Sequence, residues 1–308
     1  MGKYTASLPA LKLSFSVGRD LNEDRAVVAR RQAVRLLAAF DGCGGVGARR
    51  YQKLNNRTGA YLAAGLYAGC LQRWFDESAP GPPQTPAGEA LSALFLQTAV
   101  QYNAQVLKAE PSAVTGSMVR TLPSTAAIAL LYPEAATVLW AGNTRAYLLT
   151  GGGLRQLTQD DLAVPCGAFD SLYADSPITN YLSADQPFAL HEITVPLPAR
   201  GVFILATDGA FHALPTPMHL EALLLDTMCQ ATGKQQWKQL LKEQLSARAA
   251  DDVTLILQPL GFAMLAEMQA HFDKRRRHVR QAYILPADQA ERENITALRA
   301  LWDLYQRE

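Results

Sequence analysis

The order of strand-like and helix-like segments restricts the fold of this chain more than any other feature of its sequence. Short apolar runs rich in β-forming residues come first, and two long segments with helical spacing follow. More strands, two further helices and a final strand come after them. Because strands do not alternate singly with helices, a parallel doubly wound sheet is disfavoured. The pattern predicts an α+β fold: an antiparallel β-sandwich flanked by helices in α-β-β-α layers, with a C-terminal helical extension.

The expected strands share apolar or alternating patterns that end at turn residues. They are residues 11–17, 26–29, 34–40, 126–132, 137–142, 145–149, 190–195, 201–206 and 252–257. The expected helices have apolar residues at helical spacing, and they are residues 56–75, 89–107, 218–229 and 234–246. Residues 76–88, which include four prolines, are expected to form a surface connector, and residues 160–187 a loop.

The character of the sequence changes beyond Gly261. Residues 262–280 have the spacing of an amphipathic helix with a basic end, which we expect to be a solvated face. Pro286 and Asp288 are expected to open a last helix, with Asp288 as its N-cap. We therefore expect one large domain at residues 8–260 and a C-terminal helical extension at residues 261–308.

Composition excludes several classes of protein. The formal net charge of +1 over 308 residues gives no sign of binding to nucleic acid or to a membrane surface. The four cysteines form no Cys-x-x-Cys pair, which argues against a zinc knuckle, a thioredoxin-type site and a disulfide framework. Neither an apolar signal-peptide core nor a run of about 18 apolar residues is present. These observations predict a cytoplasmic protein.

Aspartates follow or precede four of the expected strands, in or beside turns. They lie in the segments Asn22-Glu23-Asp24, Asp41-Gly42, Asp208-Gly209 and Asp251-Asp252. Carboxylates at adjoining strand ends can converge on one pocket, and hard cations such as Mg²⁺ and Mn²⁺ prefer oxygen ligands. Taken singly, each Asp-Gly pair indicates only a turn. The four together favour a metal pocket.

Several segments, in the same order and spacing, resemble the motifs of the metal-dependent protein phosphatases of type 2C, in a bacterial-like form. They are Gly18-Arg19-x-x-Asn22-Glu23-Asp24, Phe40-Asp41-Gly42-Cys43-Gly44-Gly45, Ser124-Thr125-Ala126, Trp140–Leu149, Leu157-Thr158-Gln159-Asp160, Phe203–Gly209 and Asp251–Leu255. The resemblance covers about residues 10–258 and leaves out the C-terminal helices.

The resemblance implies a phosphatase that removes phosphate from phosphoserine and phosphothreonine in proteins, with two Mn²⁺ or Mg²⁺ ions as cofactors. Water activated between the two cations would attack phosphorus. By the same match, the metal ligands are Glu23, Asp41, the Gly42 carbonyl, Asp208 and Asp251. The expected partners are phosphorylated proteins, the substrates of a Ser/Thr kinase.

Two further residues receive catalytic roles from the resemblance. Arg19 offers a fork of donors that fits two phosphate oxygens at once. The alternative for Arg19 is a surface ion pair with Asp20 or Glu23. Asp24 would act behind the metal ligands, and Asp41 is counted as catalytic as well because it bridges both cations.

The sequence departs from the family pattern at several positions. A third metal site of bacterial relatives uses carboxylates where this chain has Asn143 and His212, so that site is predicted to be weak, absent or altered. His212 is either a ligand, a general acid or a polar neighbour of the pocket. Cys43 is expected to be an inert small side chain. Asp252 is expected to be solvated rather than to crowd Asp251.

Two other interpretations remain open. Loss of third-site carboxylates permits a regulatory pseudophosphatase, which keeps the fold with little activity. Alternatively, the C-terminal helices bind a partner, and assembly of a complex is the main role. Arg49 and Arg50 add positive charge near the expected cleft, where they either hold acidic or phosphorylated substrate or are merely solvated.

Overall fold

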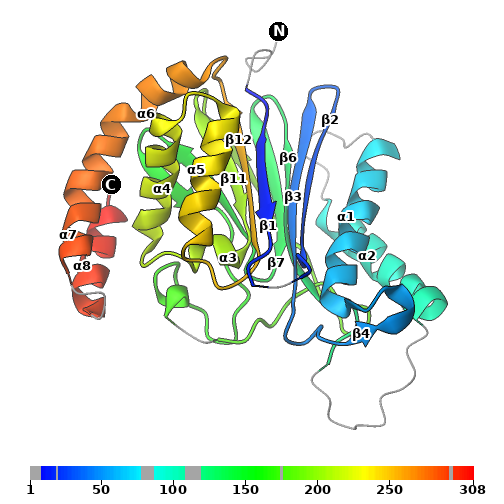
Figure 1. Cartoon of the computed structure of the whole chain (residues 1–308). Helices are drawn as coiled ribbons and strands as arrows, with labels where there is room; N and C mark the ends of the chain where they lie inside the picture. Colours follow the sequence, from blue (N-terminus) through cyan, green and yellow to red (C-terminus); the bar gives the residue numbers. More distant parts are fainter. Residues whose placement is uncertain (1–7, 19, 78–86, 108–118, 174–175, 291–293) are drawn as a thin grey trace.

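The computed structural model describes residues 8–18, 20–77, 87–107, 119–173, 176–290 and 294–308. Two five-stranded antiparallel sheets form its centre (Figure 1). The first runs in the order β1 (Leu11–Phe15), β12 (Val253–Leu260), β11 (Gly201–Ala206), β8 (Arg145–Thr150) and β9 (Gly153–Gln156). The second runs in the order β10 (His191–Pro196), β7 (Ala135–Ala141), β6 (Ser124–Leu131), β3 (Val34–Gly42) and β2 (Asp24–Arg31).

Helices cover the outer faces of both sheets (Figure 1). On one side they are α1 (Gly59–Glu77) and α2 (Gly88–Tyr102), which continues through the π-turn η2 (Asn103–Leu107). On the other side they are α4 (Pro217–Gln230), α5 (Lys234–Ser246) and α6 (Leu265–Val279). The α+β prediction with its α-β-β-α layers is therefore confirmed. None of the described helices is long and apolar enough to cross a bilayer.

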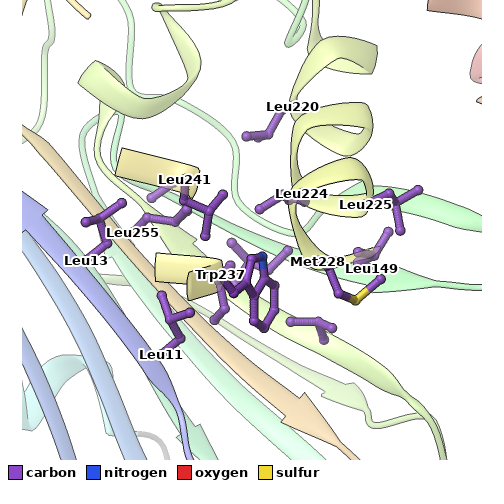
Figure 2. Close-up of a cluster of buried hydrophobic side chains, with 14 of the residues drawn as sticks. Leu11, Leu13, Leu149, Leu220, Leu224, Leu225, Met228, Trp237, Leu241 and Leu255 are labelled. Atoms are coloured by element: carbon purple, nitrogen blue, oxygen red, sulfur yellow. The ribbon is translucent and has the colours of Figure 1, made fainter. Parts of the chain in front are cut away.

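Alternation along the strands divides the apolar side chains among three core layers. In β3, Leu37 and Ala39 lie in the layer between the two sheets, whereas Ala38 and Phe40 pack beneath α1 and α2. Successive side chains of a strand point to opposite faces, so each central strand contributes to two layers. The third layer lies between the first sheet and α4 and α5, where Trp237 is surrounded by leucines (Figure 2).

Three short elements had no periodic signal in the sequence. They are the hairpin of β4 (Arg50–Tyr51) and β5 (Arg57–Thr58), which encloses the 3-10 turn η1 (Gln52–Leu54), the one-turn helix α3 (Asp208–Phe211), and the edge strand β9. Elements of two to four residues are shorter than one hydrophobic repeat, so a pattern of apolar residues cannot reveal them. Residues 160–187 form a loop, interrupted by η3 (Asp170–Leu172), within their described part.

The C-terminal helices differ from the expectation in two respects. Asp288 is not an N-cap: it lies in α7 (Leu285–Gln289), which follows α6 through the π-turn η4 (Arg280–Ile284). Pro286 is the second residue of α7 and follows the π-turn directly. The last helix, α8 (Ile295–Tyr305), begins later, and the side chain of Asn294 caps it by accepting from the Ala297 amide at 3.1 Å.

The basic end of α6 is only partly solvated. Lys274 and Arg277 are exposed as expected, but Arg275 is buried. Its guanidinium pairs with Glu221 of α4 at 2.8 Å and with Glu308 at 2.6 Å. The prediction of a solvated face is therefore wrong for Arg275, because a buried guanidinium requires carboxylate partners and finds them across the helix interface.

Candidate metal and active site

Two of the candidate ligand segments meet at one end of the sandwich. Asp24 opens β2 and stands directly opposite Asp41 near the end of β3. Asn22 fixes the entry to β2, because its side-chain oxygen accepts from the Asp24 amide at 2.9 Å. The Thr207 hydroxyl, at the end of β11, donates to the Asp24 carboxylate at 2.8 Å. This bond joins the two sheets beside the carboxylates.

The four aspartates interact electrostatically. Burial raises the pKa of Asp41 well above its usual range, and the charges of Asp208, Asp24 and Asp251 raise it further. Burial also raises the pKa of Asp24 to about 7. Burial, followed by the charge of Asp251, raises the pKa of Asp208, against the opposing effects of His212 and Asn143. Carboxylates that repel one another in a water-poor site are stabilised by a bound cation.

Two oxygen atoms in this cluster are buried without a hydrogen-bond donor, namely Asp24 Oδ1 and Asn143 Oδ1. Buried acceptors are nearly always satisfied, so such atoms point to a cation or a water as their partner. Within the described ranges, no three His, Cys, Asp or Glu side chains are drawn together closely enough to hold a metal as they stand. The chemistry of the donors, which are all oxygens, fits Mg²⁺ or Mn²⁺.

Both Asp-Gly pairs require glycine because another backbone segment lies against them. A Cβ at Gly42 would lie 2.3 Å from the carbonyl oxygen of Ala60 in α1. A Cβ at Gly209 would lie 2.1 Å from the carbonyl oxygen of Asp252. Neither glycine has a positive φ, so close approach rather than turn conformation explains the residue type. The turns that carry Asp41 and Asp208 are thereby packed firmly in place.

Glu23 is held from two sides. The Thr58 hydroxyl donates to its carboxylate, and its own amide donates to the Asp252 carboxylate at 2.6 Å. Asp252 also accepts from the Val17 amide at 3.2 Å and is almost fully buried. The expectation of a solvated Asp252 is therefore wrong. Nothing in the sequence around Thr58 or Asp252 indicated these contacts, because both partners are distant along the chain.

Asn143 and His212, which replace carboxylates of the third metal site in bacterial relatives, lie in different environments. The Asn143 side-chain amide donates to the Asp208 carboxylate at 3.0 Å, so Asn143 is part of the cluster. His212 follows α3 and is exposed, and its ring packs edge-on against Phe211 with centroids 4.8 Å apart. The structure therefore brings Asn143, but not the ring of His212, into a bond with Asp208 in the part of the chain it describes.

Cys43 is not activated as a nucleophile. Burial raises the pKa of its thiol well above the usual range, and the charges of Asp41 and Asp208 add to this effect. A thiol that stays protonated reacts slowly, which agrees with the interpretation of Cys43 as an inert side chain. Arg19, the expected phosphate ligand, lies outside the described residues.

A buried arginine packs against α3, and the sequence did not indicate this contact. Arg145 of β8 is 1% exposed, and its guanidinium lies 3.8 Å from the centroid of the Phe211 ring. Its guanidinium donates to Asp160 at 2.9, 3.2 and 2.6 Å. It also donates to the Ser171 hydroxyl at 2.5 Å. Arg145 thus ties the loop of residues 160–187 to the element that carries Asp208.

A cavity of about 830 Å³ lies away from the aspartate cluster. It opens between β9, residues 165–168 and the C-terminal helices, and Cys166, Arg275, Trp302 and Tyr305 contribute to its wall. The Tyr305 hydroxyl accepts from the Leu154 amide at 3.2 Å, which satisfies part of the free edge of β9. The cavity therefore belongs to the contact between the loop and the C-terminal extension.

Solved structures with the same fold were found. Serine/threonine phosphatase Stp1 from Staphylococcus aureus is 17% identical, with a TM-score of 0.60 over 82% of this chain and 95% of that chain. The Mycobacterium tuberculosis serine/threonine phosphatase PstP/Ppp is 20% identical, with a TM-score of 0.60 over 82% and 99%. PppA from Pseudomonas aeruginosa, described as a key regulatory component of T6SS, is 20% identical, with a TM-score of 0.58 over 82% and 99%.

At these identities the structural likeness shows the fold alone. No curated protein sequence matches the chain. The sequence model of the family described as Protein phosphatase 2C matches residues 17–246, which is well over half of the chain and includes two of the candidate ligand segments at the N-terminal side together with Asp208. The resemblance in the motifs is confirmed, and the chain belongs to the protein phosphatase 2C family.

Proposed function

We propose that this chain is a metal-dependent phosphoserine/phosphothreonine protein phosphatase, with phosphorylated proteins as substrates. The observation that carries the proposal is the convergence of Asp24, Asp41, Asp208 and Asp251, whose charges act on one another at one end of the sandwich. The catalytic domain of PstP, which has been solved with two manganese ions, is 21% identical and supports a two-metal site.

The ligands in the proposal follow the family match. Glu23, Asp41, the Gly42 carbonyl, Asp208 and Asp251 would hold two Mn²⁺ or Mg²⁺ ions. When bound, these ions supply positive charge that lowers the pKa of a water and neutralises the phosphoryl group.

The protein's own groups position these ligands. The Thr58 hydroxyl orients the Glu23 carboxylate, and the Thr207 hydroxyl orients Asp24 behind the ligands. Asn143 donates to one oxygen of Asp208 and so leaves the other for a cation. Arg19 is proposed to bind the phosphate of the substrate through its planar fork of donors.

The domain boundary is also part of the proposal. Residues 8–260 would form the phosphatase domain, and residues 261–308 a C-terminal extension that docks on α4 through Arg275 and Glu221. Partner binding through the extension would then use the faces of α6–α8 that are turned away from α4. A cytoplasmic location agrees with the four cysteines, all of which are free.

A second candidate is a regulatory pseudophosphatase with the same fold. It is favoured by Asn143 at a carboxylate position and by the exposure of His212 at another. Under this alternative the cluster would still bind metal, but turnover would be negligible.

Hydrolysis of para-nitrophenyl phosphate and of a phosphothreonine peptide, with Mn²⁺, with Mg²⁺ and with EDTA, distinguishes the two candidates. The phosphatase predicts metal-dependent turnover that falls by at least about 100-fold in Asp208→Ala and in Asp41→Asn. Asp303→Asn, at an exposed position of α8, is the matched control and should keep full activity. A folded protein that binds Mn²⁺ without turnover would support the pseudophosphatase.

A further inference from the structure

The segment between Asp41 and Asp76 contains five basic residues and no acidic residue. Four of the five, Arg49, Arg50, Lys53 and Arg57, lie on residues 49–58, which we name the basic hairpin. It consists of β4, η1 and β5 and lies beneath α1 in Figure 1. Arg49, Arg50 and Lys53 are exposed, and Arg57 is partly buried. The hairpin therefore presents a concentrated positive charge to solvent.

The base of the hairpin is attached to the candidate active site. Thr58, its last residue, donates its hydroxyl to the carboxylate of Glu23. The next residue, Gly59, donates its amide to the Arg49 carbonyl at 2.8 Å and closes the hairpin. The charge is thereby fixed beside the aspartate cluster, because Arg57 directly precedes Thr58, the residue that contacts Glu23.

Arg25 extends the positive surface from the hairpin to the edge of the cluster. Its guanidinium lies 4.2 Å from the centroid of the Tyr61 ring, and that of Arg57 lies 4.7 Å from the same centroid. Arg25 directly follows Asp24 in β2 and donates to the Asp24 carbonyl at 2.6 Å. Two arginines held on one aromatic ring keep a defined position despite their like charge.

Asp185 is an acidic residue near this surface. Its charge adds to the effect of burial in raising the pKa of Tyr51. Its two carboxylate oxygens accept from the Thr121 amide at 2.9 Å and from the Ser183 hydroxyl at 2.6 Å. One carboxylate engaged in this way does not neutralise five basic side chains. Arg49, Arg50 and Lys53 therefore remain exposed beside a carboxylate that is already engaged.

We propose that the basic hairpin and Arg25 bind acidic residues that flank the phosphorylated residue of a protein substrate. This inference rests on the proposed function and specifies its substrate class: phosphoproteins with Asp or Glu close to the phosphorylated position. Exposed ion pairs each contribute little, so selectivity arises from several pairs acting together. Their attraction is long-ranged and is screened by salt.

Binding of two phosphothreonine peptides tests this inference. The peptides have the same length, one with Glu and one with Gln at the flanking positions, and affinity is measured by fluorescence anisotropy. We expect the wild-type protein to bind the Glu peptide about 10-fold more tightly than the Gln peptide. This preference would arise from a few exposed ion pairs, each of which contributes less than about 1 kcal/mol. In the triple variant Arg49→Gln, Arg50→Gln, Lys53→Gln the preference should fall below about 2-fold. It should also fall in about 0.5 M salt.

A second triple variant controls for net charge. Lys234→Gln, Lys238→Gln, Lys274→Gln removes the same charge from exposed positions of α5 and α6 and should keep the preference. Hydrolysis of para-nitrophenyl phosphate should be the same in both triple variants, since this substrate has no flanking residues.

Several results would overturn the inference. The first is equal affinity of the wild-type protein for both peptides. The second is an equal loss of the preference for the Glu peptide in the two triple variants. The third is that the hairpin binds a single-stranded oligonucleotide more tightly than it binds the Glu peptide. Affinity is measured without turnover. A protein that prefers the Glu peptide but does not hydrolyse phosphate would therefore count against the proposed function alone.

Discussion

The guanidinium of Arg145 and the carboxylate of Asp160 form a buried, two-pronged ion pair, with side chains 2% and 4% exposed. Removing one partner leaves the other charge buried without compensation, which typically costs about 3–5 kcal/mol. We therefore expect Arg145→Ala to lower the free energy of unfolding by about 3 kcal/mol or more. Urea denaturation followed by tryptophan fluorescence measures this difference.

An exposed pair on α6 provides the matched control. Arg277 contacts Asp273 at 3.0 Å, and their side chains are 65% and 44% exposed. Arg277→Ala should change the free energy of unfolding by less than about 0.5 kcal/mol, because solvent screens such pairs. Equal effects of the two substitutions would show that the buried pair does not hold the loop to β8.

The metal-free protein should lose stability as the pH rises from about 4 to about 7. Burial raises the pKa of Asp24 from an ordinary 3.8 to about 7, so the folded state keeps a proton that the unfolded state releases. The contribution of protonated Asp24 to the free energy of unfolding is fully present below pH 3.8, and it is lost as the pH rises through the folded-state pKa. A shift of this size corresponds to roughly 4 kcal/mol.

Thermal denaturation in EDTA at pH 5 and pH 8 tests this effect. The melting temperature should be lower at pH 8, and Mn²⁺ should restore it there more than at pH 5, since a cation favours the charged carboxylates. In Asp24→Asn the melting temperature should depend less on pH. Histidines titrate in both proteins, so the difference between the two proteins isolates the effect of Asp24. A metal-free protein that becomes more stable between pH 5 and pH 8 would contradict the electrostatic account of the cluster.

The fold could be predicted from the sequence because its central strands are long and their faces are buried. In β3, Leu37 and Phe40 serve two different core layers, and the resulting apolar run ends at an Asp-Gly turn that is visible in the sequence. The contacts of Asp252 and Thr58 could not be predicted, because each depends on a backbone or side-chain partner brought close only by folding. The prediction of Asp288 as the cap of the last helix is wrong because Asp288 and Asn294 both suit an N-cap. The π-turn η4, which leads the chain into α7, has no sequence signal.

The two Asp-Gly turns should not tolerate a methyl group. In Gly42→Ala the Cβ would lie 2.3 Å from the Ala60 carbonyl oxygen, and in Gly209→Ala it would lie 2.1 Å from the Asp252 carbonyl oxygen. Backbone must move in both cases, so we expect a loss of about 1–3 kcal/mol in the free energy of unfolding, typical of overpacking. Weaker Mn²⁺ binding, measured by calorimetry, should accompany it.

Gly45→Ala is the matched control in the same turn region. No atom lies within 4 Å of the position of its Cβ, and its φ is not positive. This substitution should be neutral, or stabilising by a few tenths of a kcal/mol through the unfolded chain. If Gly42→Ala were equally neutral, the close approach of α1 to the turn would not be required.

The C-terminal extension should stabilise the loop that Arg145 anchors. Trp302 of α8 stacks on Tyr305 with ring centroids 5.3 Å apart, and Phe169 of the loop belongs to the same buried cluster. Arg299 adds an ion pair with Asp170. Trp302→Ala removes a large buried ring and should lower the free energy of unfolding by about 3 kcal/mol. Hydrogen exchange should accelerate in α8 and also at residues 170–172.

Leu304→Ala separates this effect from a general change of the helix, because Leu304 is exposed on α8 and lies outside the buried cluster. It should leave exchange at residues 170–172 unchanged. Faster exchange in α8 of Trp302→Ala, with no change at residues 170–172, would mean that the loop is held by Arg145 and Asp160 alone. Faster exchange at both sites means that docking of the extension and order in the loop are coupled, since Phe169 cannot keep its packing when the ring of Trp302 is absent.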